Sequence, residues 1–337
     1  SIIATGSHNT TNAPHGTIGN GANNTTTFYL DAGNYSSVVN GSGNSVFASN
    51  FSTVLNGSLN SIKFGSYHVI NSGKENTISS DGSSNYIVNG HSNQIGVPGT
   101  MADSINYSSI CGGFNNIIGL LANNDNNSNY SLVLSGLACR VQSDSSFIGG
   151  GNANKIVETF VRYHSDNSCI WNGSGNYILS QKNSNPFSMI LNGKNNYSGS
   201  LTYAYNSRGD FSVVLNGNDN KCYSSHHSIM FNNSNSILGD VAYSAYSAML
   251  GCRDCQIGTS LPTLKIGHNL MIGNFQNITL SGHYNTHIGG GRGVISNTCG
   301  YNFFFNNDLG SALLVFSGGF NNNYNCSIVG ESKSNIM

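Results

Sequence analysis

Short apolar pairs followed by Asn-Gly recur along most of the chain. The clearest copies run from Ser37 to Val46 and from Thr53 to Ile62, with two apolar residues, Asn-Gly, two variable residues, Asn, one variable residue and then Val or Ile. β-branched residues in pairs, bounded by Gly and Asn, are typical of very short strands. No stretch sustains the three-to-four residue spacing of an amphipathic helix. The pattern therefore predicts an all-β chain.

The glycine of each unit serves as an anchor for the repeat. The anchors fall at positions 21, 41, 57, 73, 90, 113, 136, 151, 173, 193, 217, 232, 252, 274, about 290, 319 and 331, with a residue other than glycine at 232, 274 and 331. The short spacings cluster near 15 to 17 residues. The longer ones add residues between the apolar residue that closes one unit and the aromatic that opens the next. Insertions at one point of a constant unit indicate a solenoid with loops on one face.

Four columns keep the same phase relative to the anchor. An aromatic residue stands six positions before it, a serine five before, an aliphatic residue three before and an asparagine three after. The aromatic column contains Tyr35, Phe51, Tyr67, Tyr107, Tyr130, Phe187, Phe211 and Tyr246. The asparagine column contains Asn44, Asn60, Asn76, Asn93, Asn116, Asn154, Asn176, Asn196, Asn220 and Asn235.

One unit contains two short strands and two turns, because Asn-Gly supplies the positive φ values that a tight corner requires. A single coil cannot bury its own apolar edge, so the coils must stack. Stacking places like residues about 4.8 Å apart. We therefore expect the asparagine amides to bond from rung to rung and the aromatic residues to stack.

The repeats resemble the head repeats of the YadA-like trimeric autotransporter adhesins. That family carries repeats of the type Ser-x-Ala-x-Gly-x-x-Ser-x-Ala, and the segment from Ser52 to Ile62 is similar, with Val, Leu and Asn in place of Ala and Ser. The segment from Ile148 to Ile156 also resembles repeats of phage and large-virus proteins, some of them fibre or tail components. The resemblance extends from about residue 17 over nearly the whole chain. It implies a left-handed parallel β-roll in which three chains pack side by side.

The expected fold is an all-β parallel β-solenoid, a left-handed roll of about 15–17 short rungs with loop insertions on one edge. Residues 1–16 are expected to form an N-terminal extension or cap, and residues 17–337 the solenoid repeat domain. A right-handed β-helix of the tailspike kind is the alternative, since longer rungs would suit the average spacing. Ser332 to Ile336 still follows the rung pattern, so we expect the chain to continue into, or stack on, more of the same.

Composition and charge narrow the function. Charged residues make up 8% of the chain, against roughly 25% in an average soluble domain. The 42 glycines and 54 asparagines would suit a disordered polar segment, but the 38% of hydrophobic residues recur in phase, which favours a folded chain. A net charge of −1 without a Lys/Arg cluster excludes the basic footprint of nucleic-acid binding. No apolar run approaches the ~18 residues that span a bilayer.

Two pairs of residues suggest chemistry. Cys252 and Cys255, with two residues between them, could be half of a zinc site or a redox pair. They occupy the anchor and asparagine columns, however, which favours two small buried residues. Asp210 and Asp219 flank one rung and come nearest to the carboxylate pair that glycan hydrolysis requires. Asp in a turn is normally a turn residue. The sequence therefore predicts no catalytic residue.

Histidines are the remaining candidates for metal binding. His226 with His227, and His283 with His287, could ligate a metal across a trimer axis. The first two occupy the aromatic and serine columns of their rung, which favours packing. The sequence therefore predicts no metal site and no cofactor.

The long insertions are the best candidates for binding, because loops on a rigid scaffold commonly hold recognition residues. They span 96–106, 120–129, 158–167, 198–210, 240–246, 258–269 and 296–309. The aromatic residues predicted to bind are Tyr203, Tyr205, Tyr243, Tyr301, Phe303 and Phe304. The aromatic column could itself be an exposed sugar-stacking ladder, but packing of its rings under the corner of each coil is the favoured interpretation.

These observations predict a structural and adhesive fibre protein and not an enzyme. The expected assembly is a homotrimeric shaft whose loops contact a cell-surface receptor or glycan in host attachment. The expected location is extracellular, on a virion surface or a cell surface. The alternative is a tailspike-like polysaccharide-degrading enzyme on a right-handed β-helix, which paired carboxylates in one groove would favour.

Overall fold

The computed structural model shows an all-β chain with parallel pairing between its strands, and no helix among the described residues. The described residues are 1–29, 34–96, 105–119, 128–158, 167–180, 187–199, 212–223, 225–226, 228–235, 237–238, 244–245 and 248–250, and after residue 250 only the strands β30 to β39. Within this part of the chain, no helix has the length and apolar character to cross a membrane. The chain divides into two compact units, residues 1–157 with 170–172, and residues 158–169 with 173–337.

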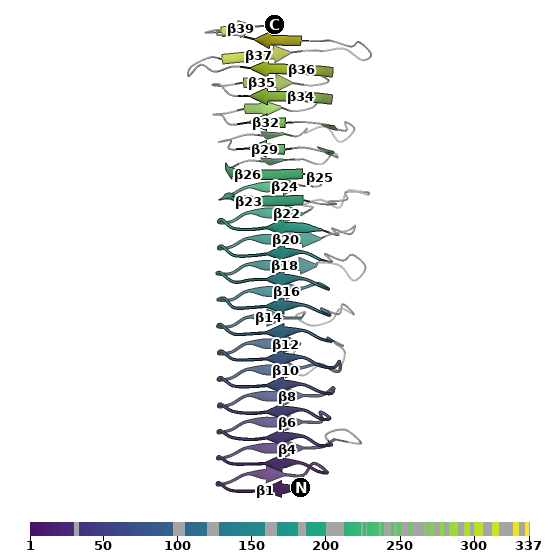
Figure 1. Ribbon diagram of the computed structural model, residues 1–337, viewed down its shortest axis with the longest axis vertical. Coiled ribbons are helices and arrows are strands. Elements are labelled where there is room, and N and C mark those ends of the chain that lie inside the picture. The colour runs from purple at the N-terminus through teal and green to yellow at the C-terminus, as the bar shows by residue number, and fades with distance from the viewer. Residues whose placement is uncertain are drawn as a thin grey trace. The chain divides into compact units, whose positions relative to one another are not determined.

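The first unit is a stack of coils, each made of one odd-numbered and one even-numbered strand (Figure 1). The odd-numbered strands form sheet A: β1 (Ile2–Ile3), β3 (Thr17–Ile18), β5 (Ser37–Val38), β7 (Thr53–Val54), β9 (Val69–Ile70), β11 (Tyr86–Ile87), β13 (Ser109–Ile110), β15 (Leu132–Val133) and β17 (Phe147–Ile148). The even-numbered strands form sheet B: β2 (Thr10–Thr11), β4 (Thr25–Thr27), β6 (Ser45–Phe47), β8 (Ser61–Lys63), β10 (Thr77–Ser79), β12 (Gln94–Gly96), β14 (Ile117–Ile118) and β16 (Arg140–Gln142).

Every strand of the first unit pairs in parallel with the strand of the next coil. In sheet A, for example, Val38 pairs with Val54 and Val54 with Ile70. In sheet B, Val46 pairs with Ile62, which pairs with Ile78. Eight complete turns, from β1–β2 to β15–β16, follow one another in this way. The expected all-β parallel solenoid is confirmed, while its left-handed winding stays a prediction.

The core of the first unit is a double row of aliphatic side chains between the two sheets. From β3 onward, each strand of this unit has a buried residue beside an outward-facing one, as a period of two requires. The aliphatic residues of these rows have no exposed surface: Ile18, Val38, Val54, Ile70, Ile87, Ile110, Val133 and Ile148 from sheet A, and Val46, Ile62, Ile78, Ile95, Ile118 and Val141 from sheet B. The apolar column of the sequence therefore supplies the core.

The second unit continues the same pairing. Its sheet A strands are β21 (Ser188–Ile190), β23 (Ser212–Asn218), β26 (Ser228–Ser234), β29 (Ala248–Leu250), β32 (Leu270–Ile272), β34 (His283–Ile288), β36 (Gly300–Phe305) and β38 (Cys326–Val329), with β25 (Ser225–His226), β28 (Ser244–Ala245) and β31 (Ile266–Gly267) pairing beside them. Its sheet B strands are β20 (Tyr177–Ser180), β22 (Tyr197–Gly199), β24 (Lys221–Tyr223), β27 (Ile237–Leu238), β30 (Gln256–Ile257), β33 (Asn277–Thr279), β35 (Gly293–Ser296), β37 (Ala312–Phe316) and β39 (Ser334–Ile336). β18 (Lys155–Glu158) and β19 (Cys169–Ile170) lie where the chain passes between units.

Residues 1–16 already carry two strands of the stack. β1 pairs with β3, and β2 pairs with β4, in the same parallel register as the later coils. The division into a cap at 1–16 and a repeat domain at 17–337 stays a prediction.

In the first unit, three segments lie outside the described residues, and each of them follows an even-numbered strand. They are 30–33, 97–104 and 120–127. This is the point of the coil at which the sequence places its insertions.

Candidate functional site

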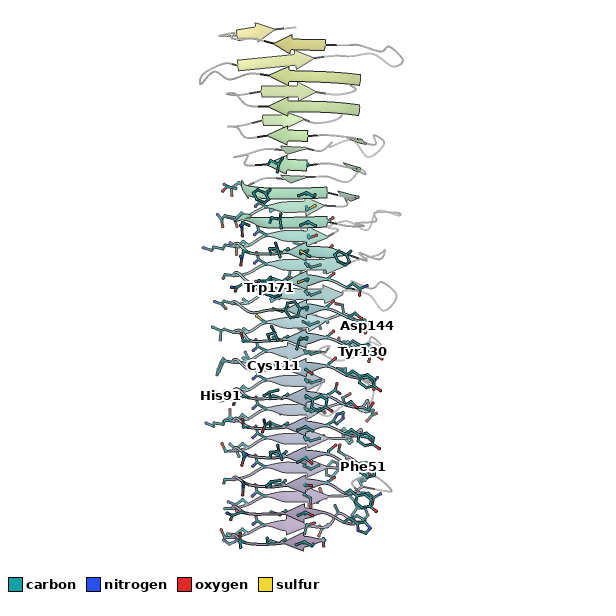
Figure 2. The ribbon with its side chains drawn as sticks, in the orientation of Figure 1. Phe51, His91, Cys111, Tyr130, Asp144 and Trp171 are labelled. Atoms are coloured by element: carbon teal, nitrogen blue, oxygen red, sulfur yellow. The ribbon has the colours of Figure 1, made fainter. Side chains whose placement is uncertain are left out.

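Each coil of the first unit turns at two corners. The glycine corner, residues 40–43 and their equivalents, joins a sheet A strand to the following sheet B strand. The aromatic corner, residues 48–52 and their equivalents, joins sheet B back to sheet A. Figure 2 shows His91 of a glycine corner and Phe51 and Tyr130 of aromatic corners projecting from opposite edges of the stack. The polar and exposed side chains of the molecule are organised around these two corners.

The anchor glycine is required by its backbone and by its neighbours. The φ values of Gly41, Gly57 and Gly73 are 113°, 107° and 108°, outside the region that other residues adopt readily. A Cβ atom on Gly57 would lie 2.1 Å from the carbonyl oxygen of Gly73 and 2.5 Å from Nδ2 of Asn60. Any side chain here would therefore separate successive coils.

The asparagine column forms a buried ladder behind the anchor. Nδ2 of Asn60 donates to the carbonyl oxygen of Gly73 at 3.0 Å and to that of Asn56 at 3.2 Å, and its Oδ1 accepts from the backbone N–H of Asn76 at 3.0 Å. The same bond from amide to anchor carbonyl recurs at Asn24, Asn44, Asn76, Asn93, Asn116, Asn176 and Asn196. The expected rung-to-rung bonding is confirmed, and most of it joins side-chain amides to backbone groups. A buried polar group is stable only when it is bonded in this way.

Cys139 replaces asparagine in this column. Its backbone N–H still donates to Oδ1 of Asn116 at 3.0 Å, but its thiol approaches the carbonyl oxygens of Gly150 and Gly151 only at 3.9 and 3.7 Å. Burial raises the pKa of the Cys139 thiol. The residue therefore fills the place of the amide as a neutral, weakly bonding side chain.

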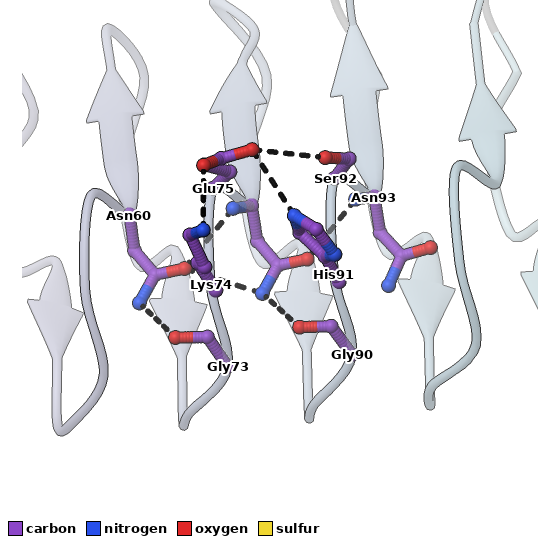
Figure 3. A network of polar contacts seen from close by, with 9 residues as sticks. Asn60, Gly73, Lys74, Glu75, Gly90, His91, Ser92 and Asn93 are labelled. Atoms are coloured by element: carbon purple, nitrogen blue, oxygen red, sulfur yellow. Dashed lines mark hydrogen bonds and ion pairs between the residues drawn. The ribbon is translucent and has the colours of Figure 1, made fainter.

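The exposed side of the glycine corner carries a small charged network, drawn in Figure 3. Glu75 contacts Nζ of Lys74 at 3.2 Å through Oε1, and Nε2 of His91 at 3.1 Å and Oγ of Ser92 at 3.3 Å through Oε2. Hydrogen bonding to His91 and then to Lys74 lowers the pKa of Glu75. All four side chains lie at the surface, where ion pairs of this kind contribute little.

The serine column forms a second buried ladder, next to the aromatic corner. Oγ of Ser108 accepts from the backbone N–H of Ser131 at 3.1 Å and donates to the carbonyl oxygen of Ser128 at 2.6 Å. Within the same column, the fully buried His68 stands in place of serine. Its Nδ1 accepts from the N–H of Asn85 at 3.3 Å, and its Nε2 lies 3.3 Å from the carbonyl oxygen of Ser80.

These partners assign the proton of His68 to Nε2, since one ring nitrogen faces a donor and the other an acceptor. The neutral ring therefore satisfies both the N–H of Asn85 and the carbonyl oxygen of Ser80. Burial lowers the pKa of His68 to about 4, with the bond to Ser80 opposing the shift. The second ladder therefore contains one group that a fall in pH can disrupt.

The aromatic corner presents its rings to solvent. Phe51 stacks on Tyr35 at 5.1 Å between ring centroids and on Tyr67 at 5.2 Å, each with 7° between the ring planes. His15 extends this stack below Tyr35 at 4.6 Å. Exposed fractions run from 47% at Phe51 to 53% at Tyr67. The interpretation that these rings pack under the corner is wrong: the buried residue of the corner is the one that follows each ring, a serine or His68, and the rings form an exposed ladder.

The ladder has a gap one coil wide at Ser84, and after Tyr130 the column position belongs to Ser145 and then Asn167. Tyr107 and Tyr130 form a second stack, 5.1 Å apart and 9° from parallel. Between Tyr67 and Tyr107, the column position belongs to Ser84. The φ of Ser84 is 57°, against 58° and 55° at the two tyrosines, so the backbone of the corner continues unchanged through the coil that lacks a ring.

The outward faces of the two sheets differ in charge. Over seven successive coils of the first unit, the outward residues of sheet A and the residue after each strand are Ser37, Val39, Thr53, Leu55, Val69, Asn71, Tyr86, Val88, Ser109, Cys111, Leu132, Leu134, Phe147 and Gly149. None of these is charged, and Tyr86 and Val88 are each 42% exposed. We call this surface the apolar face. Sheet B carries Lys63 and Arg140 at its outward positions.

Half of the predicted binding residues lie outside the described residues, namely Tyr203, Tyr205 and Tyr243. Tyr301, Phe303 and Phe304 lie in β36, which pairs in parallel with β34 and β38. The expectation that residues 296–309 form a loop is therefore wrong for this part, because consecutive apolar residues continue the sheet. Binding by these six residues stays a prediction.

The other sequence candidates are placed only in part. Cys252, Cys255, His227 and Asp210 lie outside the described residues. His226 lies in β25, and His283 and His287 lie in β34. Asp219 occupies the glycine-corner position with a φ of 55°. In the part of the chain that the structure describes, no three His, Cys, Asp or Glu side chains gather into a metal-binding group.

No protein-family model matches this chain, and a search of curated proteins gives no significant match.

Proposed function

We propose that the chain is a structural and adhesive fibre protein, a stiff solenoid shaft of the kind found in YadA-like heads and viral fibres. Its place is extracellular, on a virion or cell surface, and it binds a receptor or glycan there without acting as an enzyme. The parallel coils, joined by a fully buried aliphatic core and two buried polar ladders, support the role of a stiff shaft.

The apolar face is the observation that carries this proposal. It extends over seven coils, roughly 30 Å at about 4.8 Å per coil, without a charged side chain. Large exposed apolar patches mark protein–protein contacts, and depletion of charge is the compositional signature of the buried centre of an interface. A regular face that repeats with the coil suits another copy of the same chain. The proposed assembly is a homotrimer in which the apolar faces are buried around a common axis.

The experiment is a measurement of mass by light scattering on the wild type and on a variant carrying Val39→Lys and Val88→Lys. A trimer of the 35.6 kDa chain would have a mass of about 107 kDa, three times that value. The double variant should fall to a single chain while keeping its β-sheet circular dichroism, because the buried ammonium groups would lack partners. The matched control is Thr77→Lys on sheet B, which should remain a trimer. A monomeric wild type would overturn the proposal.

Adhesion is tested on the same assembled protein. Binding to host cells or to immobilised glycans should require the trimer, because several weak sites on one shaft bind together more tightly than each alone. Digestion of the polysaccharide that it binds would instead support the depolymerising tailspike. The aromatic residues from Tyr203 to Phe304 that the sequence predicts as contacts are then replaced with alanine one at a time.

A further inference from the structure

We propose that the gap in the aromatic ladder at Ser84, between the faces of Tyr67 and Tyr107, is a binding slot for one pyranose ring of a glycan. This inference rests on the proposed adhesive function, for which it supplies a site and a ligand class. None of the six aromatic residues predicted from the sequence takes part in it.

The backbone shows that Ser84 occupies a place in the ladder. Its N–H donates to the carbonyl oxygen of Ser66 at 3.0 Å, and the N–H of Tyr107 donates to that of Ser83 at 3.0 Å. The corners at Tyr67 and Tyr130 are bonded to their preceding coils in the same way, through Asn50 and Asn106. The three corners at Tyr67, Ser84 and Tyr107 are therefore in register, and only the middle one lacks a ring.

The flanking rings turn their faces toward the gap. Tyr67 lies 7° from parallel to Phe51 below it, and Tyr107 lies 9° from parallel to Tyr130 above it. Each tyrosine thus has one face covered by its own stack and the other directed along the ladder toward Ser84. Two coil spacings separate these free faces, which gives a distance of about 10 Å between ring centres at ~4.8 Å per coil. The side chains of Tyr67 and Tyr107 are 53% and 54% exposed, so both walls lie at the surface of the molecule.

The spacing of the two walls admits one ring between them. Phe51 lies in the same way between Tyr35 and Tyr67, with ring centroids 5.1 and 5.2 Å away, so a guest ring at Ser84 can contact both tyrosines. A pyranose chair has C–H bonds that project from both of its faces. It can contact both tyrosines, whose electron-rich faces attract the partly positive hydrogens.

The edges of the slot are polar, as the rim of a sugar requires. Ser84 supplies a hydroxyl at its base, and Tyr67 and Tyr107 each carry a phenolic hydroxyl at the ring edge. Ser83, beside Ser84, is held in the corner because its N–H and Oγ both donate to Oδ1 of Asn106, at 2.8 and 3.3 Å. Two apolar walls with a few hydroxyls at the rim are the usual composition of a small-ligand site.

The test uses the full chain and a panel of cellohexaose, maltohexaose, chitohexaose and mannohexaose. Binding is measured by calorimetry and by saturation-transfer NMR from the tyrosine ring protons. At least one of these sugars should bind with one site per chain and show saturation of the C–H protons of its ring. Ser84→Tyr, which completes the ladder, should weaken that binding at least tenfold and raise the thermal unfolding midpoint.

A second variant creates the same slot elsewhere. Phe51→Ser removes the ring between Tyr35 and Tyr67 and should raise the stoichiometry from one site to two. Equal affinity in Ser84→Tyr and the wild type would overturn the inference. So would the absence of binding by every sugar of the panel, or binding of indole in the slot where no sugar binds.

Failure of this inference is separable from failure of the shaft proposal, because the mass of each sample is measured alongside. A trimer that binds no sugar leaves the shaft standing and removes the slot. A monomer that binds sugar in a Ser84-dependent manner keeps the slot and removes the trimeric shaft.

Discussion

At the glycine corner the anchor residue, which has a positive φ, lies against the next coil, whereas at the aromatic corner the residue of positive φ projects into solvent. Gly57 has a φ of 107° and no room for a Cβ atom, while Phe51 of the same coil has a φ of 52° and carries a large ring. The value at Phe51 lies in the left-handed region that other residues can reach at modest cost. Positive φ alone does not therefore demand glycine. At Gly57 the demand comes from its larger φ and from the neighbouring coil, toward which a side chain would point.

The two corners also differ in what stabilises the stack behind them. Behind the glycine corner, a fully buried asparagine such as Asn60 bonds three backbone groups. Behind the aromatic corner, a serine hydroxyl has a single proton to donate, which Ser108 shares between the carbonyl oxygens of Ser128 and Asn106 at 2.6 and 3.3 Å. The exposed rings add contacts of their own. Substitutions at the glycine corner should therefore cost much more than substitutions at the aromatic corner.

The largest effect is expected from Asn60→Leu. The change keeps the branched shape of the side chain but leaves the buried N–H of Asn76 without its acceptor, at about 1–3 kcal/mol. It also removes the bonds to the carbonyl oxygens of Gly73, which keeps the N–H of Ser58, and of Asn56, at about 1 kcal/mol each. We expect a loss of about 4 kcal/mol in the free energy of unfolding, measured by urea denaturation. The control is Asn56→Ala, whose exposed side chain bonds only Asn40, with a loss of less than about 1 kcal/mol. Equal losses for the two variants would show that the buried asparagine ladder does not stabilise the stack more than an exposed asparagine does.

Gly57→Ala should follow. The added Cβ meets the Gly73 carbonyl oxygen at 2.1 Å, and the φ of 107° is strained for alanine, which together cost about 3 kcal/mol. Hydrogen exchange should show the added opening in the coils on either side of residue 57. A loss no greater than that of a surface substitution would show that the coils can separate without cost.

Acid should weaken the aromatic side of the stack through His68. Its pKa of about 4 in the folded chain lies below the unfolded value of 6.5, so the unfolded chain binds the proton first. The contribution of His68 is complete above pH 6.5 and is lost as the pH falls toward 4, up to about 3 kcal/mol. His68→Ser, which restores the usual residue of the column, should flatten the dependence between these values. An unchanged slope in that variant would mean that other groups cause it.

The smallest effect is expected from Phe51→Ala. The ring loses two stacked neighbours, each worth about 0.5–1.5 kcal/mol when buried and less when half of the ring is exposed. We expect a loss of about 1 kcal/mol by urea denaturation, roughly a third of the loss from Gly57→Ala in the same coil. A loss as large as that of Gly57→Ala would mean that the exposed ladder, and not the glycine corner, determines the stability of the coil.

The sequence predicts the glycine corner well because its requirements are local. Asn-Gly, the asparagine three residues later and the aliphatic pairs each have one role, and all four columns keep their phase through the insertions. The coil, its core and the asparagine ladder could therefore be predicted from particular residues such as Gly57 and Asn60.

The exposure of the aromatic corner was not predictable from phase alone, since period-two alternation does not hold through a residue of positive φ. A signal was nevertheless present. Ser84 and Ser145 stand in the aromatic column, and a buried apolar position would not be expected to accept them. The slot was missed for a related reason, because it consists of a side chain that is too small and not of a motif. The strand at Tyr301 was missed because the long anchor spacing suggested a loop.

The asparagine ladder has a direction. Nδ2 of each asparagine donates to the anchor carbonyl of the coil that follows, and Oδ1 accepts an N–H from that same coil, as Asn44 does with Gly57 and Asn60. During synthesis, a coil that has left the ribosome therefore presents an amide whose partners are still to come. Each newly made coil completes the one before it and exposes the next such amide. The chain can thus fold in the order in which it is translated, each coil serving as the template for its successor.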